Sequence, residues 1–280
     1  MLAYRHLFHA GGYADVFKHA LLQGLLFSLV KKAKPFFYLD THAGIGRYDL
    51  THAWAQKNRE FEHGISLLWE RKDLPATLRF YVEQIRAENP NGVLRYYPGS
   101  PAIARRLMRR DDRMVLMELN KDDCAALTKL FTHDRQVHVH CMDGYQALKA
   151  FLPPPERRGL VLIDSSFDRA KEFARISEAL NVAYKRWATG SFAIWYPLME
   201  PNAIVAFERA IIATGIRKIL KLEFAIEAED WTLTMRGCGM LVVNPPWQFE
   251  DDAQALLAWL WPVLSTKGEG ASSVNWLVRE

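Results

Sequence analysis

Apolar positions along the chain follow two alternating patterns, one with the period of a helix and one typical of short buried strands. Residues 13–31 carry apolar side chains at helical spacing and end in lysines, which suit a helix C-terminus. Short apolar runs then alternate with amphipathic stretches, which predicts a doubly wound α/β sheet. We expect strands at 35–39, 113–119, 137–141, 159–164, 191–197 and 218–224, and helices at 100–110, 122–131, 145–152, 171–187 and 201–214.

A long helical segment interrupts this alternation near its start. The distance from the strand ending near Asp40 to the next clear strand at Val115 is far longer than an ordinary βα connection. We therefore predict a sheet domain of residues 1–49 and 96–280, with an inserted helical subdomain at 50–95. An insertion at the carboxyl edge of a sheet lies beside the ligand crevice, so this one either helps to hold substrate or is a packing appendage.

Composition indicates an ordinary globular protein. Half of the 280 residues are apolar, and a formal charge of +4 suits an anionic partner as well as it suits a slightly basic enzyme. The longest apolar run, "ALLQGLLFSLV", is shorter than the roughly 18 residues of a membrane span, so we expect neither a signal peptide nor an anchor. The three scattered cysteines form no metal motif, and we interpret them as reduced thiols of a cytoplasmic protein.

Three expected strands end in residues that could bind a nucleoside. The first leads into Gly44-Ile-Gly46, a turn that lets backbone approach a ligand. The second ends at Glu118, where doubly wound folds place a carboxylate for ribose hydroxyls. The third ends in Asp143-Gly144, which could read an adenine edge. Each end also has a plain structural explanation, but three in succession favour a nucleoside cofactor.

S-adenosylmethionine suits this crevice better than NAD, because the dinucleotide fingerprint lacks a glycine and the chain carries motifs like those of aminomethyltransferases. A helix with Ser100 as its predicted N-cap and Pro101 at its first position begins in the segment "YYPGSPAIARRLMRR". The amides at its N-terminus suit the methionine carboxylate.

Seven segments together give the chain a specific family resemblance: "YRHLFHAGGYADVFKH", "YLDTHAGIGRY", "LRYYPGSP", "DG" before a helix, "RRGLVLID", "ATGIRKIL" and "GMLVVNPPW". The chain resembles the RlmJ family of adenine-N6 methyltransferases, which act on 23S ribosomal RNA. The resemblance implies a class I methyltransferase sheet with an inserted helical subdomain. It assigns cofactor contacts to His19, His42, Ser100, Glu118, Asp143 and Gly144, catalysis to Asp164, and an RNA contact to Tyr4. From the residues alone, His19 and His42 would be structural.

The expected catalytic loop is Asp164-Ser-Ser-Phe167, where the family more often has Asp-Pro-Pro-Tyr. Adenine N6 is a poor nucleophile, because its lone pair is delocalised into the ring. We expect Asp164 and the carbonyl of Ser165 to accept its two N–H groups, and Phe167 to stack on the splayed base. The serines remove the rigidity of proline, which predicts a looser loop and lower activity.

A second tetrapeptide, Asn244-Pro-Pro-Trp247, is closer in spelling to the family motif. The link before its strand lacks a convincing crossover helix, so this strand, the last that we expect, should be antiparallel. Its carboxyl end then lies at the opposite edge from the cofactor. We interpret Pro245 and Pro246 as the end of the strand, with Trp247 packed nearby.

The leading hypothesis is therefore S-adenosylmethionine-dependent N6-methylation of an adenine in 23S ribosomal RNA. The alternative is a nucleic-acid-binding protein, or a DNA adenine methyltransferase linked to the use of external DNA, in which the serine loop has weakened or abolished transfer. We expect no metal and no membrane partner. A monomer is expected, because the mild charge and the absence of a heptad pattern give no argument for assembly.

Overall fold

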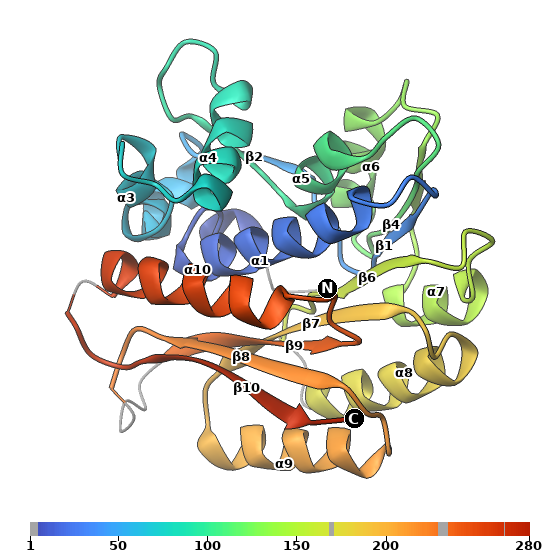
Figure 1. The fold of residues 1–280 in the computed structure, drawn as a ribbon. Coiled ribbons are helices and arrows are strands. Elements are labelled where there is room, and N and C mark those ends of the chain that lie inside the picture. Colours follow the sequence, from blue (N-terminus) through green and yellow to red (C-terminus); the bar gives the residue numbers. More distant parts are fainter. Residues whose placement is uncertain (1–4, 168–170, 229–234, 266) are drawn as a thin grey trace.

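A mixed eight-stranded sheet forms the centre of the computed structural model, which describes residues 5–167, 171–228, 235–265 and 267–280 (Figure 1). The strands are β1 (Phe37–Asp40), β4 (Arg113–Met117), β5 (Val137–His140), β6 (Gly159–Ile163), β7 (Ser191–Leu198), β8 (Ile219–Ala225), β9 (Gly237–Val243) and β10 (Ser272–Val278). Their order in space is β10-β8-β9-β7-β6-β1-β4-β5.

Strand directions match the predicted class I S-adenosylmethionine-dependent methyltransferase fold. β1 pairs in parallel with β4 and β6, and β9 lies antiparallel between β7 and β8. The predicted direction of β9 is thus confirmed. The expectation that β9 is the last strand is wrong, because β10 pairs antiparallel with β8 at the edge of the sheet. β10 is partly exposed along its length and lacks a continuous apolar run, so periodicity alone did not reveal it.

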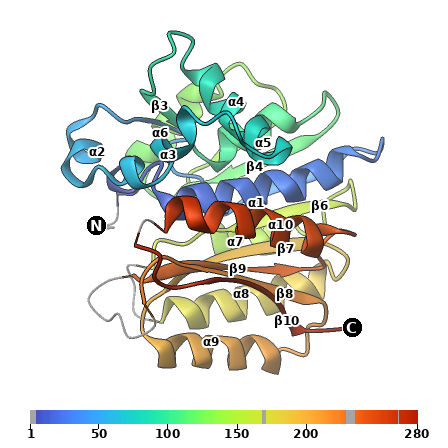
Figure 2. The same cartoon turned by 60° about the vertical axis from the view of Figure 1, so that its left-hand side comes forward.

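Helices cover both faces of the sheet (Figures 1 and 2). One face packs against α1 (Tyr13–Val30), α5 (Ser100–Leu107) and α10 (Phe249–Leu264), and the other against α7 (Gly144–Phe151), α8 (Glu172–Arg186) and α9 (Pro201–Ala213). In β6, Leu160 and Leu162 join the first core, whereas Val161 and Ile163 join the second. This strand is therefore apolar at every position, as expected for a strand buried on both faces. The helix α6 (Lys121–Leu130) connects β4 to β5.

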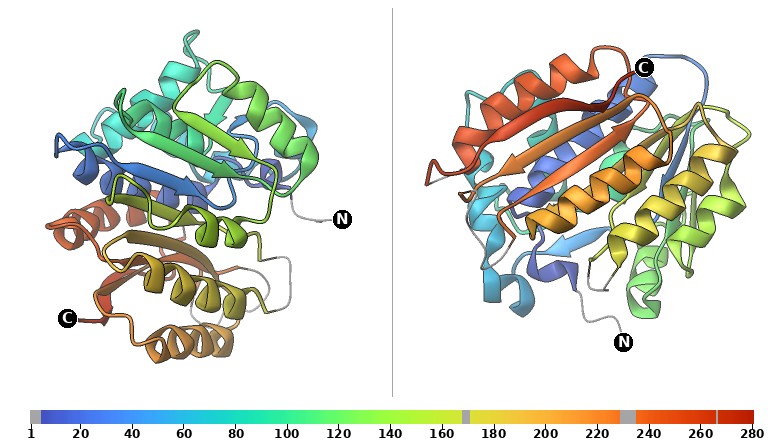
Figure 3. Two further views of the ribbon diagram at one scale, coloured as in Figure 1. Left: turned by 90° about the vertical axis from the view of Figure 1, so that its right-hand side faces the viewer. Right: turned by 90° about the horizontal axis from the view of Figure 1, so that it is seen from below.

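Residues 50–95 form a group of short helices on the α1 side of the sheet (Figures 2 and 3). Two three-residue strands, β2 (Arg47–Asp49) and β3 (Tyr96–Pro98), pair antiparallel where this segment leaves and rejoins the chain. The predicted division at 49/50 and 95/96 remains a prediction. Within residues 50–95 the elements are α2 (Ala53–Asn58), η2 (Glu60–His63), α3 (Ser66–Trp69) and α4 (Ala76–Glu88). A further short element, η1 (His6–Phe8), precedes α1.

Candidate active site

A cavity of about 770 Å³ lies where the parallel strands of the central sheet reach their carboxyl ends. That volume is in the usual range for cofactor and small-molecule sites. The predicted residue Tyr4 lies outside the described part of the chain. The other predicted site residues all line the cavity: His19, His42, Ser100, Glu118, Asp143, Gly144, Asp164 and Phe167.

Ser100 does not cap α5 as predicted. Gly99 is the N-cap residue, and Ser100 is the first residue of the helix. Its hydroxyl instead donates to Oδ2 of Asp40 at 2.7 Å, and the hydroxyl of Tyr38 donates to the same oxygen at 2.9 Å. Burial raises the pKa of Asp40 to about 6 despite these two donors. The position of Ser100 in the sequence predicts a helix cap, but in the folded chain its hydroxyl is hydrogen-bonded to the buried carboxylate of Asp40 in β1.

Glu118 holds the glycine turn after β1. One carboxylate oxygen accepts from the backbone N–H of Gly44 at 2.9 Å, and the other accepts from that of Asn120 at 2.8 Å. Burial raises the pKa of Glu118 above its ordinary value. Because an ionised carboxylate can accept about four hydrogen bonds, this side chain keeps capacity for a ligand.

Asp143 and Gly144 bring the start of α7 against the turn after β1. The carboxylate of Asp143 accepts from the N–H of Tyr145 at 2.9 Å and from the guanidinium of Arg175 at 3.2 Å. A Cβ at Gly144 would come within 1.9 Å of the carbonyl oxygen of Thr41. No other residue permits this approach, so the glycine keeps the two turns in contact.

Asp164 has a cationic neighbour that the sequence patterns did not indicate. Nζ of Lys18 donates to Oδ2 of Asp164 at 2.6 Å and lies 2.9 Å from Oδ1 of Asp15. Asp15 in turn lies 3.0 Å from Nε2 of His6. The three polar residues Asp15, Lys18 and His19 are all buried in α1. Their spacing of one helical turn within an apolar helix was the available signal.

Ion pairs and burial together set the charge states of Lys18, His19 and His42. Burial by itself would lower the pKa of Lys18, but the two carboxylates raise it well above its ordinary value. Burial lowers the pKa of His19 to about 3. His19 is therefore neutral near pH 7, and its Nδ1 lies 2.8 Å from the hydroxyl of Tyr97. His42 also has a pKa lowered by burial.

The loop after β6 is tied to the neighbouring helices by Glu172. The hydroxyls of Ser165 and Tyr145 each donate to Oε1 of Glu172 at 2.6 Å. Arg175 donates to Oε2 of Glu172 at 3.1 Å and also binds Asp143. The side chains of Ser165 and Glu172 are both buried. The serine hydroxyl thus fixes the first loop position, where the family's proline would act through its ring.

Phe167 packs against aromatic side chains from α8 and β7. Its ring lies 4.9 Å from that of Phe173 and 5.9 Å from that of Trp195, both in edge-on geometry. The backbone of Phe167 has φ of 52°, a left-handed conformation that is costly for a bulky residue. Such conformations persist where the surroundings hold them, and they concentrate at functional sites.

Asn244 lies at the opposite edge of the sheet, as predicted, and is not among the described residues that line the cavity. Its side-chain amide donates to the carbonyl oxygens of Ala188 and Gly190 at 2.9 and 2.8 Å, which is a structural role. The prediction that Trp247 packs nearby is wrong, because this side chain is 89% exposed. Phe249, the first residue of α10, is the aromatic that is buried there.

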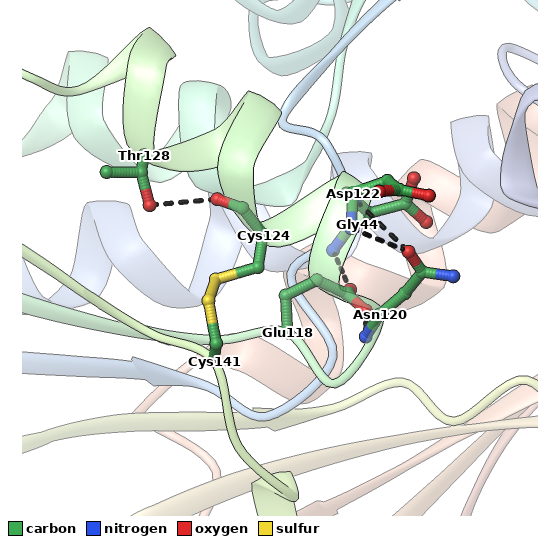
Figure 4. The surroundings of a disulfide bond; sticks show 8 residues. Gly44, Glu118, Asn120, Asp122, Cys124, Thr128 and Cys141 are labelled. Atoms are coloured by element: carbon green, nitrogen blue, oxygen red, sulfur yellow. Dashed lines mark hydrogen bonds between the residues drawn. A yellow bond between two sulfur atoms is a disulfide. The ribbon is translucent and has the colours of Figure 1, made fainter.

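Two of the three cysteines form a disulfide, so the prediction of three reduced thiols is wrong for this pair (Figure 4). Cys124 in α6 and Cys141 just after β5 have Cα atoms 5.7 Å apart, a normal separation for a disulfide. The helical connection between adjacent strands brings them together across 17 positions of sequence. Cys238 is free and buried in β9. The disulfide joins α6, which follows Glu118, to the end of β5, which precedes Asp143.

Among the described residues, no group of three or more His, Cys, Asp and Glu side chains could hold a metal ion. Within the same ranges, no helix is both long enough and apolar enough to cross a bilayer.

Comparison with known proteins gives the family. The sequence model of the family described as "Ribosomal RNA large subunit methyltransferase D, RlmJ" matches residues 33–278. The chain belongs to this family. It is 44% identical to each of two proteins named "Ribosomal RNA large subunit methyltransferase J", from Escherichia coli strain K12 and from Haemophilus influenzae. Both alignments cover 100% of this chain and 100% of the relative.

A solved structure supports the fold at the level of the whole chain. The crystal structure of protein LPL1258 from Legionella pneumophila superposes with a TM-score of 0.89 at 36% sequence identity. The superposition covers 96% of this chain and 98% of that one. The architecture of this RlmJ-family chain, including its antiparallel end strands, is therefore that of a relative with an experimental structure.

Proposed function

We propose that this RlmJ-family chain transfers a methyl group from S-adenosylmethionine to N6 of an adenine in 23S ribosomal RNA. The observation that carries the proposal is the position of Asp164. It follows β6, next to β1, and lines the same cavity as Glu118 and Asp143. The carboxylate that we propose as catalytic thus shares one cavity with the groups that we propose for the cofactor, and the names of the two curated relatives supply the substrate class.

The residues of the cavity fit S-adenosylmethionine. Glu118 has acceptor capacity left for ribose hydroxyls, and Asp143 with the Gly144 amide suits an adenine edge. The N-terminus of α5 at Ser100 suits the methionine carboxylate, and His19 and His42 are neutral groups in the same lining. When bound, the cofactor supplies an electrophilic sulfonium methyl group.

The chain's own groups orient and activate the target nitrogen. Lys18 holds Oδ2 of Asp164, and we assign Oδ1 as the acceptor for one N6–H of adenine. The carbonyl of Ser165 accepts the other N6–H, which favours a pyramidal nitrogen with an available lone pair. Phe167 stacks on the base. Since a paired base cannot enter such a site, the target adenine lies in a loop, a bulge or a single strand.

We further propose that residues 50–95 are a helical insertion, that the chain acts as a monomer, and that it works in the cytoplasm, where its ribosomal substrate is made. The small β2–β3 sheet supports the first point, because it brings the two ends of the segment together.

The decisive experiment is Asp164→Ala. We expect the purified variant to lose methyl transfer to 23S ribosomal RNA, while calorimetry still detects S-adenosylmethionine binding, since Asp164 contacts the base and not the cofactor. Asp251→Ala, which removes an exposed carboxylate in α10, should behave as wild type. Substantial turnover by Asp164→Ala would reject the assignment.

Substrate class is tested in the cell. Deletion of the gene should remove one N6-methyladenine from 23S ribosomal RNA and leave chromosomal DNA unchanged. Unaltered ribosomal RNA, with a lost mark in DNA, would instead identify a DNA methyltransferase.

A further inference from the structure

An aromatic pair with one exposed and one half-buried ring lies beside the cavity, on elements that the proposed chemistry does not use. We call Phe8 of η1 and Trp54 of α2 the aromatic platform. Their rings are stacked, with centroids 5.4 Å apart and planes 18° from parallel. Trp54 is 41% exposed, which is unusual for so large an apolar side chain.

Cations surround the aromatic platform. The guanidinium of Arg5 lies 5.8 Å from the ring centre of Trp54, and the ammonium of Lys57 lies 5.8 Å from that of Phe8. Arg5 also pairs with Asp123 at 3.2 Å. Lys57 is exposed and has no ion pair to another residue that the structure describes. Aromatic faces together with cations are the combination that binds single-stranded nucleic acid.

The aromatic platform is held in place without any ligand. Nδ1 of His52 accepts from the backbone N–H of Trp54 at 3.1 Å and so caps α2. The ring of His52 also packs edge-on against Trp54, with centroids 5.3 Å apart. Ala55 is buried, so α2 has a fixed inner side. A surface that is already ordered loses little conformational freedom on binding.

The aromatic platform adjoins the mouth of the cavity. In the sequence, Phe8 lies between His6 and His9, both of which line the cavity. The element that carries Phe8, η1, contacts α2 (Figure 2). In the element that follows α2 along the chain, η2, Glu60 and His63 also line the cavity. The aromatic platform is therefore placed where the nucleotides that adjoin a base in the cavity could reach it.

We propose that the aromatic platform binds the nucleotides that flank the target adenine, with a base stacked on Trp54 and phosphates near Arg5 and Lys57. This inference rests on the proposed function and names the role of α2 in it. Extrusion of the target base breaks its stacking with its neighbours. Stacking on protein aromatics replaces part of that loss, and it is tolerant of sequence because every base has a π face.

The test compares two exposed tryptophans. Trp54→Ala should raise the KM for 23S ribosomal RNA about 10-fold, with the KM for S-adenosylmethionine unchanged, because only RNA contacts the platform. Trp54→Phe should retain most of the affinity, whereas Trp54→Leu should lose it, since leucine keeps apolar bulk but has no π face. Trp247→Ala is the matched control, because Trp247 is more exposed and lies away from the cavity, and it should match wild type.

Binding measured without methylation separates this inference from the proposed function. Fluorescence anisotropy with labelled single-stranded oligoadenylate should show weaker binding for Trp54→Ala and Trp54→Leu than for Trp247→Ala. Equal affinities for all three, or wild-type affinity for Trp54→Leu, would overturn the aromatic platform. Failure of the wild-type chain to methylate RNA would reject the proposed function and leave the anisotropy result to decide the platform alone.

Discussion

Glu172 is the residue that connects the catalytic loop to the cofactor end of the cavity. It accepts hydrogen bonds from Ser165, Tyr145 and Arg175, and Arg175 continues to Asp143. Burial alone would raise the pKa of Glu172, but these donors lower it. The buried carboxylate thus stays charged, and charge-assisted hydrogen bonds hold the loop where proline rings are missing.

Glu172→Gln should therefore loosen the loop. We expect the free energy of unfolding to fall by about 2 kcal/mol, because a buried charged acceptor is lost. We also expect kcat to fall about 10-fold, the equivalent of about 1.4 kcal/mol in the barrier. The KM for S-adenosylmethionine should change little, since Arg175 can still pair with Asp143. Glu178→Gln, an exposed position on the same helix, is the control, and equal kcat for both variants would contradict this role.

Asp40 gives the stability a defined pH dependence. Its pKa is about 6 in the folded state, whereas an exposed aspartate has about 3.9. The folded state binds this proton more tightly, so the contribution is fully present below about pH 4 and is lost as the pH rises through about 6. Asp40→Asn cannot titrate. The unfolding free energy of wild type minus that of the variant should fall by about 2 kcal/mol between about pH 4 and pH 7. A flat difference in urea titrations would disprove the shift.

At the scale of elements, the disulfide between α6 and the end of β5 joins two segments of the cofactor side. Without reductant, thiol titration in denaturant should find one free thiol, Cys238, and after reduction it should find all three cysteines. Reduction should lower the free energy of unfolding by about 3 kcal/mol, as expected for a loop of this length. The double variant Cys124→Ser/Cys141→Ser should not respond to reductant. Three thiols in the unreduced chain would show that the bond does not form.

Elements differ in how far sequence predicts them. The strands β1, β4, β6 and β7 are continuous apolar runs, because both of their faces are covered, and these were predicted. β2 and β3 were not predicted, since three residues carry no period, and their pairing depends on contacts between residues 47–49 and 96–98. β10 is ordered through its pairing with β8, as Trp276 against Leu220 illustrates.

The whole molecule is organised around α1. This helix contacts α4, α5, α10 and the sheet, which explains why it is apolar on nearly all sides. Polar residues of α1 line the cavity. His19 is also hydrogen-bonded to the hydroxyl of Tyr97 at 2.8 Å, and this hydroxyl is hydrogen-bonded to that of Tyr81 in α4 at 2.7 Å, so a buried chain of hydrogen bonds joins α1 to α4. The helices of 50–95 therefore share a core with the sheet rather than forming a separate one.

Shared packing predicts one cooperative unfolding transition for the chain. Calorimetry should give a single peak whose calorimetric and van't Hoff enthalpies agree. Tyr81→Phe, which removes one buried hydroxyl, should lower the free energy of unfolding by about 1 kcal/mol without splitting the transition. An early, separate loss of hydrogen-exchange protection in α4 would contradict a shared core.

The sequence by itself determined the alternation of strands and helices, the direction of β9 and three residues that follow strands and line the cavity, Gly44, Glu118 and Asp143, because these follow from local periodicity and from where each strand ends. The family resemblance, and not periodicity, added His19 and His42. It also ranked Asp164 above Asn244, since strand direction decides which edge a loop occupies. Only the tertiary structure placed Lys18 against Asp164, Ser165 against Glu172, and Cys124 against Cys141. Each of these contacts joins elements distant in the chain, and their partners depend on packing that no local pattern records.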